Sequence, residues 1–424
     1  MKVLIVNTSE RTGGAAVAAN RLMEALNRNG AQAKMLVRDK QTDSLKVVAL
    51  NRSPWLRWNF LWERLCLFFH LHFNRKNLFA VDIANAGSDI TRLREFREAD
   101  IIHLHWINQG MLSLKNIRKI LQSGKPVVWT MHDFWQCTGI CHYPRMCSGY
   151  LRRCGRCPYM PGGGSGSDLS NAVWNKKSKI YNTGNIIFVA CSKWLADKAR
   201  QSSLLRGRQV ECIPNAIDTH IYRPMDKQQA RERLKLPAEK RLILFVSQRI
   251  TDERKGIRFF IDAIAKIAED HPEMQETAGV VILGGHAEEF ADKLALPVYP
   301  IGFVSDEKTI LDVYNSVDLF VLPSLEDNLP NTIMESMACG VPCVGFRSGG
   351  IPEMIDHRKN GYVAKYRDAD DLSRGIYWTL CEADQEQLSR EAVRKVVMNY
   401  SQSSVALQYT EVYNHALAFK RFGI

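Results

Sequence analysis

Residues 321–343 read VLPSLEDNLPNTIMESMACGVPC, and they contain a transition that recurs along most of the chain. A short apolar run ends at Pro323, and an acidic loop follows it. A helix then begins near Pro330 and Asn331 and ends at Gly340, before the next apolar run. Short, fully apolar strands that alternate with helices are typical of a parallel sheet covered by helices on both faces.

The same alternation forms two series. The first series of apolar runs is KVLIVN, AKMLVR, DIIHLHW, PVVWTMH and NIIFVACS; the second, after residue 240, is RLILFVS, GVVILGG, VYPIGF, DLFVLPS and PCVGF. A chain of 424 residues is also too long for one ordinary core. The two series therefore predict an α/β protein with two doubly wound, Rossmann-like domains.

The spacing of these runs also predicts the domain limits. We expect a first domain over 1–215 and a second over 216–401. The segment 215–240 is polar and interrupted by proline, so we interpret it as a linker. Beyond residue 370 the pattern is helical, and we expect the last helix, 402–424, to pack back on the first domain.

The composition is that of a soluble globular protein, with 46% hydrophobic and 24% charged residues. The N-terminal run MKVLIVN is strand-like and unlike a secretory leader, so we expect a cytoplasmic protein with reduced cysteines. The net charge of +12 suits an anionic partner. A nucleic-acid-binding protein would need clustered basic residues with interleaved aromatics. Only 54–76 offers this, and we expect no nucleic-acid partner.

The segment 54–76, PWLRWNFLWERLCLFFHLHFNRK, has the pattern of an amphipathic helix. Charges interrupt it too often for a membrane span. It could lie on an anionic membrane surface or a lipid acceptor, or it could pack on the domain core. The apolar residues at helical spacing are Trp55, Trp58, Trp62, Leu65, Phe69 and Phe73, and the basic residues are Arg57, Arg64, Arg75 and Lys76.

Two places combine a strand end, a turn and a helix start, where phosphate groups bind. In the first, Gly13 and Gly14 allow close approach of the backbone, although a plain turn explains them equally well. They do not form G-x-G-x-x-G, so a dinucleotide site is poorly supported. In the second, Asp327 lies at the carboxyl end of a strand, and Glu335 lies one helical turn in, where it could accept two ribose hydroxyl hydrogen bonds.

The second place resembles the donor site of the retaining glycosyltransferases of family 4. That pattern is an acidic residue, seven others and Glu, followed by Ala-Met-Ala-Cys-Gly or a similar run. Here DNLPNTIME supplies Asp327 and Glu335, and SMACGVPCV supplies the rest. The first acid is usually Glu in the family, and Glu326 lies one position off. Further blocks that resemble the family are FVSQRITDERKGI, GGIPEMI, NGYVA, ACSKWLADK and CIPNAID.

The resemblance implies the two-domain GT-B fold and transfer of a hexose from a nucleotide-diphosphate sugar, with the site in the cleft between the domains. Arg249 and Lys255 would hold the diphosphate without a catalytic metal, and Arg254 is a substitute for Arg249. His132, in TMHDFW, would point at the transferred sugar. The remaining residues expected to contact the donor are Gly13, Gly14, Asp327, Leu329, Pro330, Asn331, Thr332 and Glu335.

On the acceptor side, His105 and Trp106 would face the acceptor, a saccharide that is lipid-linked. The resemblance to colanic-acid and other exopolysaccharide transferases implies surface polysaccharide, capsule or lipopolysaccharide assembly, with peripheral membrane contact through 54–76 at the inner face of the cytoplasmic membrane. Two alternatives remain, which are a glycogen- or sucrose-type synthase of the same fold and a non-enzymatic, basic nucleic-acid-binding protein.

Five cysteines lie within CTGICHYPRMCSGYLRRCGRCP, residues 137–158. Four of them form C-x5-C-x6-C-x2-C, which suits a structural tetrahedral zinc site. Reduced packing cysteines and disulfides are the alternatives, and His142 is a substitute ligand. A subset of the family is similar here. The four expected ligands are Cys141, Cys147, Cys154 and Cys157.

Overall fold

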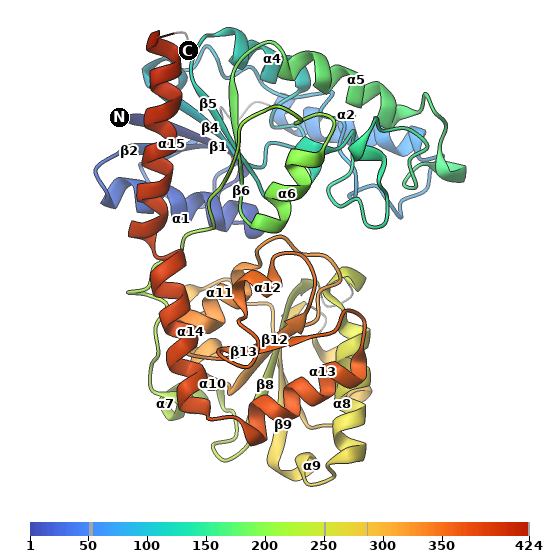
Figure 1. The fold of residues 1–424 in the computed structure, drawn as a ribbon, viewed down its shortest axis with the longest axis vertical. Helices are drawn as coiled ribbons and strands as arrows, with labels where there is room; N and C mark the ends of the chain where they lie inside the picture. The colour runs from blue at the N-terminus through green and yellow to red at the C-terminus, as the bar shows by residue number, and fades with distance from the viewer. Residues whose placement is uncertain (51–53, 250–251, 286, 423–424) are drawn as a thin grey trace. The chain divides into compact units, whose positions relative to one another are not determined.

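The computed structural model describes residues 1–50, 54–249, 252–285 and 287–422. It divides into two compact units (Figure 1). Unit 1 is Met1–Ala216 with Gln402–Ile424, and unit 2 is Ile217–Ser401. The chain thus passes between the units at residues 216/217 and again at 401/402.

Unit 1 contains a seven-stranded sheet in the order β3-β2-β1-β4-β5-β6-β7, in which all neighbours are parallel. Its strands are β1 (Lys2–Ser9), β2 (Gln32–Asp39), β3 (Val47–Ala49), β4 (Ile101–Leu104), β5 (Val127–Met131), β6 (Ile186–Ala190) and β7 (Val210–Cys212). Its helices are α1 (Gly14–Arg28), α2 (Pro54–His70), α3 (Arg94–Glu98), α4 (Leu114–Gln122), α5 (Leu169–Tyr181), α6 (Lys193–Gln201) and α15 (Gln402–Phe422).

Both faces of this sheet are buried, which explains the continuous apolar strands. Along β1, Leu4 and Val6 pack with α2, α4, α5 and α6, whereas Val3 and Ile5 pack with α1 and α15 on the opposite face. Tyr409 and Tyr413 of α15 are part of the second cluster. The last helix therefore completes the core of the first half of the chain (Figure 1).

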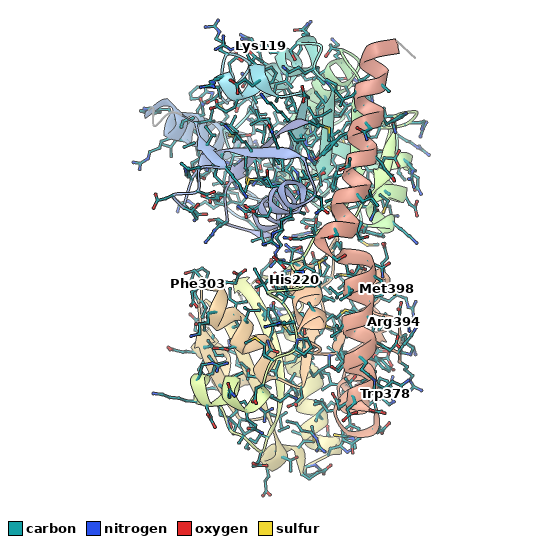
Figure 2. All side chains as sticks on the ribbon, turned by 90° about the vertical axis from the view of Figure 1, so that its left-hand side faces the viewer. Lys119, His220, Phe303, Trp378, Arg394 and Met398 are labelled. Carbon is teal, nitrogen blue, oxygen red and sulfur yellow. The ribbon has the colours of Figure 1, made fainter. Side chains whose placement is uncertain are left out.

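Unit 2 contains a six-stranded parallel sheet in the order β10-β9-β8-β11-β12-β13. Its strands are β8 (Arg241–Arg249), β9 (Ala278–Gly285), β10 (Val298–Gly302), β11 (Leu319–Leu322), β12 (Cys343–Phe346) and β13 (Gly361–Ala364). Its helices are α7 (Lys227–Leu234), α8 (Ile257–Asp270), α9 (Met274–Thr277), α10 (Glu307–Ser316), α11 (Asn331–Ala338), α12 (Ile351–Met354), α13 (Ala369–Tyr377) and α14 (Gln385–Tyr400). On α14, Arg394 and Met398 are exposed (Figure 2).

The prediction of two Rossmann-like α/β domains is confirmed. The interpretation of 215–240 as a linker is wrong, because α7 lies within it and belongs to unit 2. The polar run contains three ion pairs to neighbouring elements. Lys227 and Arg231 pair with Asp318 at 2.6 and 2.8 Å, and Arg233 pairs with Asp312 at 2.6 Å. In the described part of the chain, no helix is both long enough and apolar enough to cross a membrane.

Candidate active site

In unit 2, the turn after β8 is fixed against the end of β11. The Asp252 side chain accepts a hydrogen bond from the Arg254 N–H, and Gly256 follows with a φ of 75°. A Cβ atom on Gly256 would lie 1.9 Å from the carbonyl oxygen of Pro323, so only glycine fits there. The Leu325 N–H donates to the Arg254 carbonyl at 2.8 Å. Lys255 is thereby held beside the loop that follows β11.

Asp327 is the carboxylate that contacts the turn after β8. Its Oδ2 lies 2.6 Å from Lys255 Nζ and 3.4 Å from an Arg254 guanidinium nitrogen, and the Ser324 hydroxyl donates to it at 3.3 Å. Burial acts to raise the pKa of Asp327, but Lys255 and Arg254 outweigh it and the net pKa is lowered. The site therefore presents an ionised carboxylate between two cations.

The loop after β12 locks the Asp327 backbone. Gly349 has a φ of 57°, and a Cβ atom on it would lie 1.7 Å from the Asp327 carbonyl oxygen. The Gly350 N–H donates to that same oxygen at 3.1 Å, and the Ser348 hydroxyl donates to the Leu325 carbonyl. The GGIPEMI block thus sets the position of the carboxylate through the backbone.

Glu335 lies on the second turn of α11, and its side chain is held from the neighbouring helix α10. The Tyr314 hydroxyl donates to Glu335 Oε2 at 2.8 Å. α11 begins at Asn331, after Pro330. A helix N-terminus favours negatively charged groups, and a carboxylate one turn further in can accept hydrogen bonds from hydroxyls.

Two further predictions concern unit 2, namely the role of Arg249 and the role of the Asp-x-Asp sequence. β8 ends at Arg249, whose side chain lies outside the described residues. Arg254, the substitute for it, is the arginine beside Asp327. The Asp-x-Asp at Asp368 and Asp370 lies at the start of α13, where Asp368 accepts from the Asp371 N–H at 2.8 Å and caps the helix, as predicted.

In unit 1, the expected residues gather at one edge of the sheet. β1, β4 and β5 are parallel neighbours, so their carboxyl ends share this edge. His105 follows β4 and His132 follows β5, and His105 Nδ1 lies 2.9 Å from His132 Nε2. Gly13, with a φ of 91°, precedes α1 after β1.

Trp106 and Asp133, next to these histidines, are also bonded to each other. The Trp106 indole N–H donates to Asp133 Oδ2 at 3.0 Å. His142 joins them, with Nδ1 2.8 Å from Asp133 Oδ2 and Nε2 2.6 Å from Asp82 Oδ2. Since both ring nitrogens of His142 are used by carboxylates, it is not available as the substitute metal ligand.

A second layer of hydrogen bonds reaches α15, and sequence reasoning missed it. His103 lies between the Tyr413 hydroxyl, 2.7 Å from Nδ1, and the Thr130 hydroxyl, 2.8 Å from Nε2. The Thr130 and Tyr409 hydroxyls lie 2.8 Å apart. The sequence HLH suggested buried histidines, but the tyrosine that bonds to His103 lies 310 residues away in the sequence.

Burial lowers the pKa of these histidines, to about 3 for His103 and to about 4 for His132. The unfolded chain binds these protons below about pH 6.5, whereas the folded protein does not until pH falls to about 4 or 3. Stability is therefore complete above pH 6.5 and is lost as pH falls below it. We expect the free energy of unfolding to drop by about 2 kcal/mol per histidine between pH 6.5 and pH 5.

Urea denaturation at pH 7.5, 6.5, 5.5 and 5.0 measures this dependence. His103→Asn should reduce the slope of stability against pH, whereas His415→Asn, at an exposed histidine near the end of α15, should leave it unchanged. A free energy of unfolding that stays constant from pH 7.5 to pH 5 would contradict the assignment of neutral, buried histidines.

The helix predicted over 54–76 is present as α2, but it ends at His70, and Leu71 and Phe73 lie in the turn that follows, where Phe73 has a φ of 64°. The segment shows two distinct faces. Leu67 and Leu71 are buried in the core. On the opposite face, Trp58 is 61% exposed and Trp62 is 54% exposed. The other exposed apolar side chains of this surface, which we call the α2 face, are Leu61, Leu65, Phe69 and Phe73. The side chain of Trp55 lies outside the described residues.

The α2 face carries no exposed acidic group. From residue 54 to residue 82 the acids are Glu63 and Asp82, and both are fully buried. Glu63 accepts from the backbone N–H groups of Ile83, Ala84 and Gly110, and Asp82 pairs with Arg64. Arg64 is therefore buried, and its predicted place among the basic surface residues is wrong. Arg57, Arg75 and Lys76 are exposed. The face is therefore apolar and cationic.

Two descriptions of known protein families match the chain. The family description "Glycosyltransferase Family 4" matches residues 12–221, and "Glycosyl transferases group 1" matches residues 240–382. An uncharacterized glycosyltransferase of Methanocaldococcus jannaschii is 27% identical over 365 residues, which are 81% of this chain and 91% of the relative.

Solved structures are similar over the whole chain at low identity. Sucrose-phosphate synthase from Thermosynechococcus elongatus has a TM-score of 0.68 and 17% identity, and the match covers 98% of this chain and 99% of that one. Anabaena HepE in complex with UDP-glucose has a TM-score of 0.63 and 16% identity, with 98% and 100% covered.

The two parallel sheets and these likenesses define a glycosyltransferase with the GT-B fold. The resemblance seen in the donor stretch thereby extends over both units. The chain belongs to glycosyltransferase family 4.

Proposed function

We propose that this enzyme is a retaining hexosyltransferase that uses a nucleotide-diphosphate sugar and a lipid-linked saccharide acceptor in surface polysaccharide biosynthesis. The Lys255–Asp327 pair carries the donor half of this function, because it places a cation and a carboxylate at the carboxyl edge of the unit 2 sheet, just before the N-terminus of α11. The UDP-glucose bound by the similar HepE structure supports this class of donor.

Each charged group then has a role in the reaction. The bond between the sugar C1 and the phosphate oxygen breaks, and its electron pair leaves with the diphosphate. Lys255, together with Arg249 or Arg254, neutralises that growing charge, and so does the N-terminus of α11, formed by residues 329–332. The acceptor hydroxyl bonds to C1 on the face that the diphosphate leaves, and its proton passes to the departing phosphate oxygen.

The uncharged parts of the donor would be held by other groups. Glu335, fixed by Tyr314, accepts the ribose hydroxyls, and Asp327 accepts sugar hydroxyls. His132 contacts the transferred sugar, and Gly13 and Gly14 let the backbone approach the phosphates. His105 and Trp106 are the acceptor-side groups. Charge from protein side chains and helix ends supplies the stabilisation, so we propose that catalysis requires no cofactor.

Thermal shifts with a panel of nucleotide sugars test this function. The true donor should raise Tm in proportion to its affinity. The same donor should give a much smaller shift with Glu335→Ala, and an unchanged one with the control Glu386→Ala, at an exposed carboxylate of α14. The stabilising donor should then transfer its sugar to a lipid-linked acceptor extract with retention at C1. If no nucleotide sugar raises Tm, the donor assignment is wrong.

A glycogen- or sucrose-type synthase is the second candidate, and the likeness to sucrose-phosphate synthase supports it about equally. The acceptor distinguishes the two, because a sucrose-type enzyme acts on a soluble sugar or sugar phosphate. The α2 face favours the lipid-linked acceptor. Its exposed aromatics suit the interfacial region of a bilayer, and its basic residues suit anionic head groups.

Under this proposal the enzyme works in the cytoplasm, peripherally bound at the inner face of the cytoplasmic membrane. We expect Trp58→Ser with Trp62→Ser to weaken binding to vesicles with anionic lipids about tenfold or more, since two interfacial tryptophans are lost. Donor hydrolysis in solution should not change, because both side chains are exposed and Glu63 and Arg64 still hold the helix.

Vesicle sedimentation measures the binding. Phe303→Ser is the matched control, because Phe303 is an aromatic that is 67% exposed in unit 2 (Figure 2). Equal binding of vesicles by the double variant and the wild type would contradict the proposed membrane role of the α2 face. That result would not contradict the proposal that the enzyme uses a nucleotide sugar.

A further inference from the structure

The cysteine-rich segment folds around a small cavity of its own. The cavity measures about 20 Å³, and its lining includes all four cysteines of the C-x5-C-x6-C-x2-C pattern, Cys141, Cys147, Cys154 and Cys157. A cavity of this size has room for about one water molecule or one ion. Cys137, the fifth cysteine of the segment, is buried elsewhere, with its sulfur 3.9 Å from that of Met131.

Backbone N–H groups point at the sulfurs. The Gly139 N–H donates to Cys154 Sγ at 3.1 Å, and the Gly149 N–H donates to Cys147 Sγ at 3.4 Å. A neutral thiol is a weak acceptor, whereas a thiolate is a strong one. Two of the four sulfurs, those of Cys147 and Cys154, therefore already accept a backbone N–H group, a contact that a metal-bound thiolate also makes.

The chain around them is shaped for this arrangement. A Cβ atom on Gly139 would lie 2.3 Å from the Ser170 carbonyl and 3.1 Å from the Cys154 Cβ, so a larger residue would push this N–H away from its sulfur. Within the C-x-x-C pair, Arg156 adopts a φ of 48°, which turns the chain tightly enough for both sulfurs to reach one cavity.

A buried cation lies next to the same cysteines. Lys177 of α5 is fully buried, and its ammonium donates to the carbonyls of Trp135 and Thr138 at 2.5 and 3.0 Å. Burial lowers the pKa of Lys177 to about 7, so its charge is favoured only when negative groups lie beside it. A site with four thiolates and one divalent cation has a net charge of about −2, so a neighbouring cation partly balances it.

Four cysteine sulfurs are suitable ligands for zinc, but in the structure they are not arranged as a metal-binding cluster. Within the described residues, no three Cys, His, Asp or Glu side chains are placed so that they could hold a metal ion. All four cysteines are free thiols, and burial raises the pKa of Cys157 to about 11, so the segment is a poor redox centre. The four cysteines line one shared cavity, so metal binding would require their side chains to turn toward a common centre.

We propose that Cys141, Cys147, Cys154 and Cys157 bind one structural Zn²⁺ in this cavity. Binding replaces four thiol protons by one divalent cation, and these protons are released to solvent. This zinc site is separate from the residues that are proposed to bind the nucleotide sugar. It would fix the segment from Gly139 to His142, and His142 in turn holds Asp133 beside His132.

Metal analysis of the purified, full-length protein tests the site. We expect about one zinc per chain in the wild type, as for other four-cysteine sites. Cys381→Ser, at a half-buried cysteine of unit 2, is the matched control and should keep its zinc. Cys154→Ser should lose it and should lower Tm. Cobalt offered to the metal-free wild type should give the intense thiolate-to-cobalt absorption of a tetrahedral sulfur site, a result that does not depend on any variant folding.

Three outcomes would overturn the site. The first is wild-type protein without zinc whose four thiols are all alkylated under native conditions. The second is zinc that remains at one per chain in Cys154→Ser. The third is a mass lower by the hydrogens lost to disulfides in this segment. Because metal content and spectra are read without a donor, failure here leaves the proposed transferase function standing, and failure of the donor test leaves the zinc site standing.

Discussion

Lys255→Ala is expected to lower kcat by about 100- to 1,000-fold, which is the usual cost of removing one group that stabilises charge in a transition state. The charge on the leaving diphosphate grows as the bond to the sugar breaks, so the loss should be larger in kcat than in donor affinity. Lys255→Arg should recover part of the rate, since the arginine keeps the positive charge.

The neighbourhood of Lys255 defines the controls. Asp327 stays paired with Arg254 in the variant, so the carboxylate is not left without a cation. Lys266→Ala, at a lysine on the solvent side of α8 that pairs with Asp270, should keep full activity. Tm measured for both variants separates loss of folding from loss of rate. If Lys255→Ala and Asp327→Ala both turn over at near the wild-type rate, the donor site lies elsewhere.

His132→Ala is expected to lower kcat by about 100-fold while the affinity for the nucleoside diphosphate stays the same. The proposed nucleotide groups, Glu335 and Lys255, all belong to unit 2, whereas His132 belongs to unit 1. Loss of the His132 side chain should therefore weaken contact with the transferred sugar and leave binding of the nucleotide unchanged. His132→Asn should recover part of the rate if a hydrogen bond to the sugar is what matters.

Steady-state kinetics and calorimetric binding of the nucleoside diphosphate separate these effects. His220→Ala is the control, because His220 is an exposed histidine of unit 2 (Figure 2). A large loss of nucleotide affinity in His132→Ala, with kcat unchanged, would contradict the role at the sugar.

The strands that could be predicted from the sequence share one property, which is burial on both faces. β1, β5 and β11 are continuous apolar runs for that reason. β3 and β7 escaped prediction because they are edge strands of three residues, too short to show a pattern. β13 escaped because its NGYVA block was interpreted only as a motif.

The site could be predicted only where its residues follow one another in the chain. Asp327 and Glu335 lie on one loop and helix, so the spacing carried the information. The contact of Lys255 with Asp327 depends on two glycine turns that bring separate loops together. The hydrogen bonds of Tyr409 and Tyr413 to the β4 and β5 strands depend on where the chain returns, which no local pattern encodes.

The return of α15 also determines the order in which the protein can be completed during synthesis. Unit 2 is one continuous segment, but the first core is incomplete until α15 has been synthesised. Translation of the 217–401 segment takes on the order of 10–40 s at about 5–20 residues per second. During that time the apolar face of α1 that packs on α15 is exposed to solvent. We therefore expect nascent chains of this enzyme to depend on chaperones until the ribosome releases them.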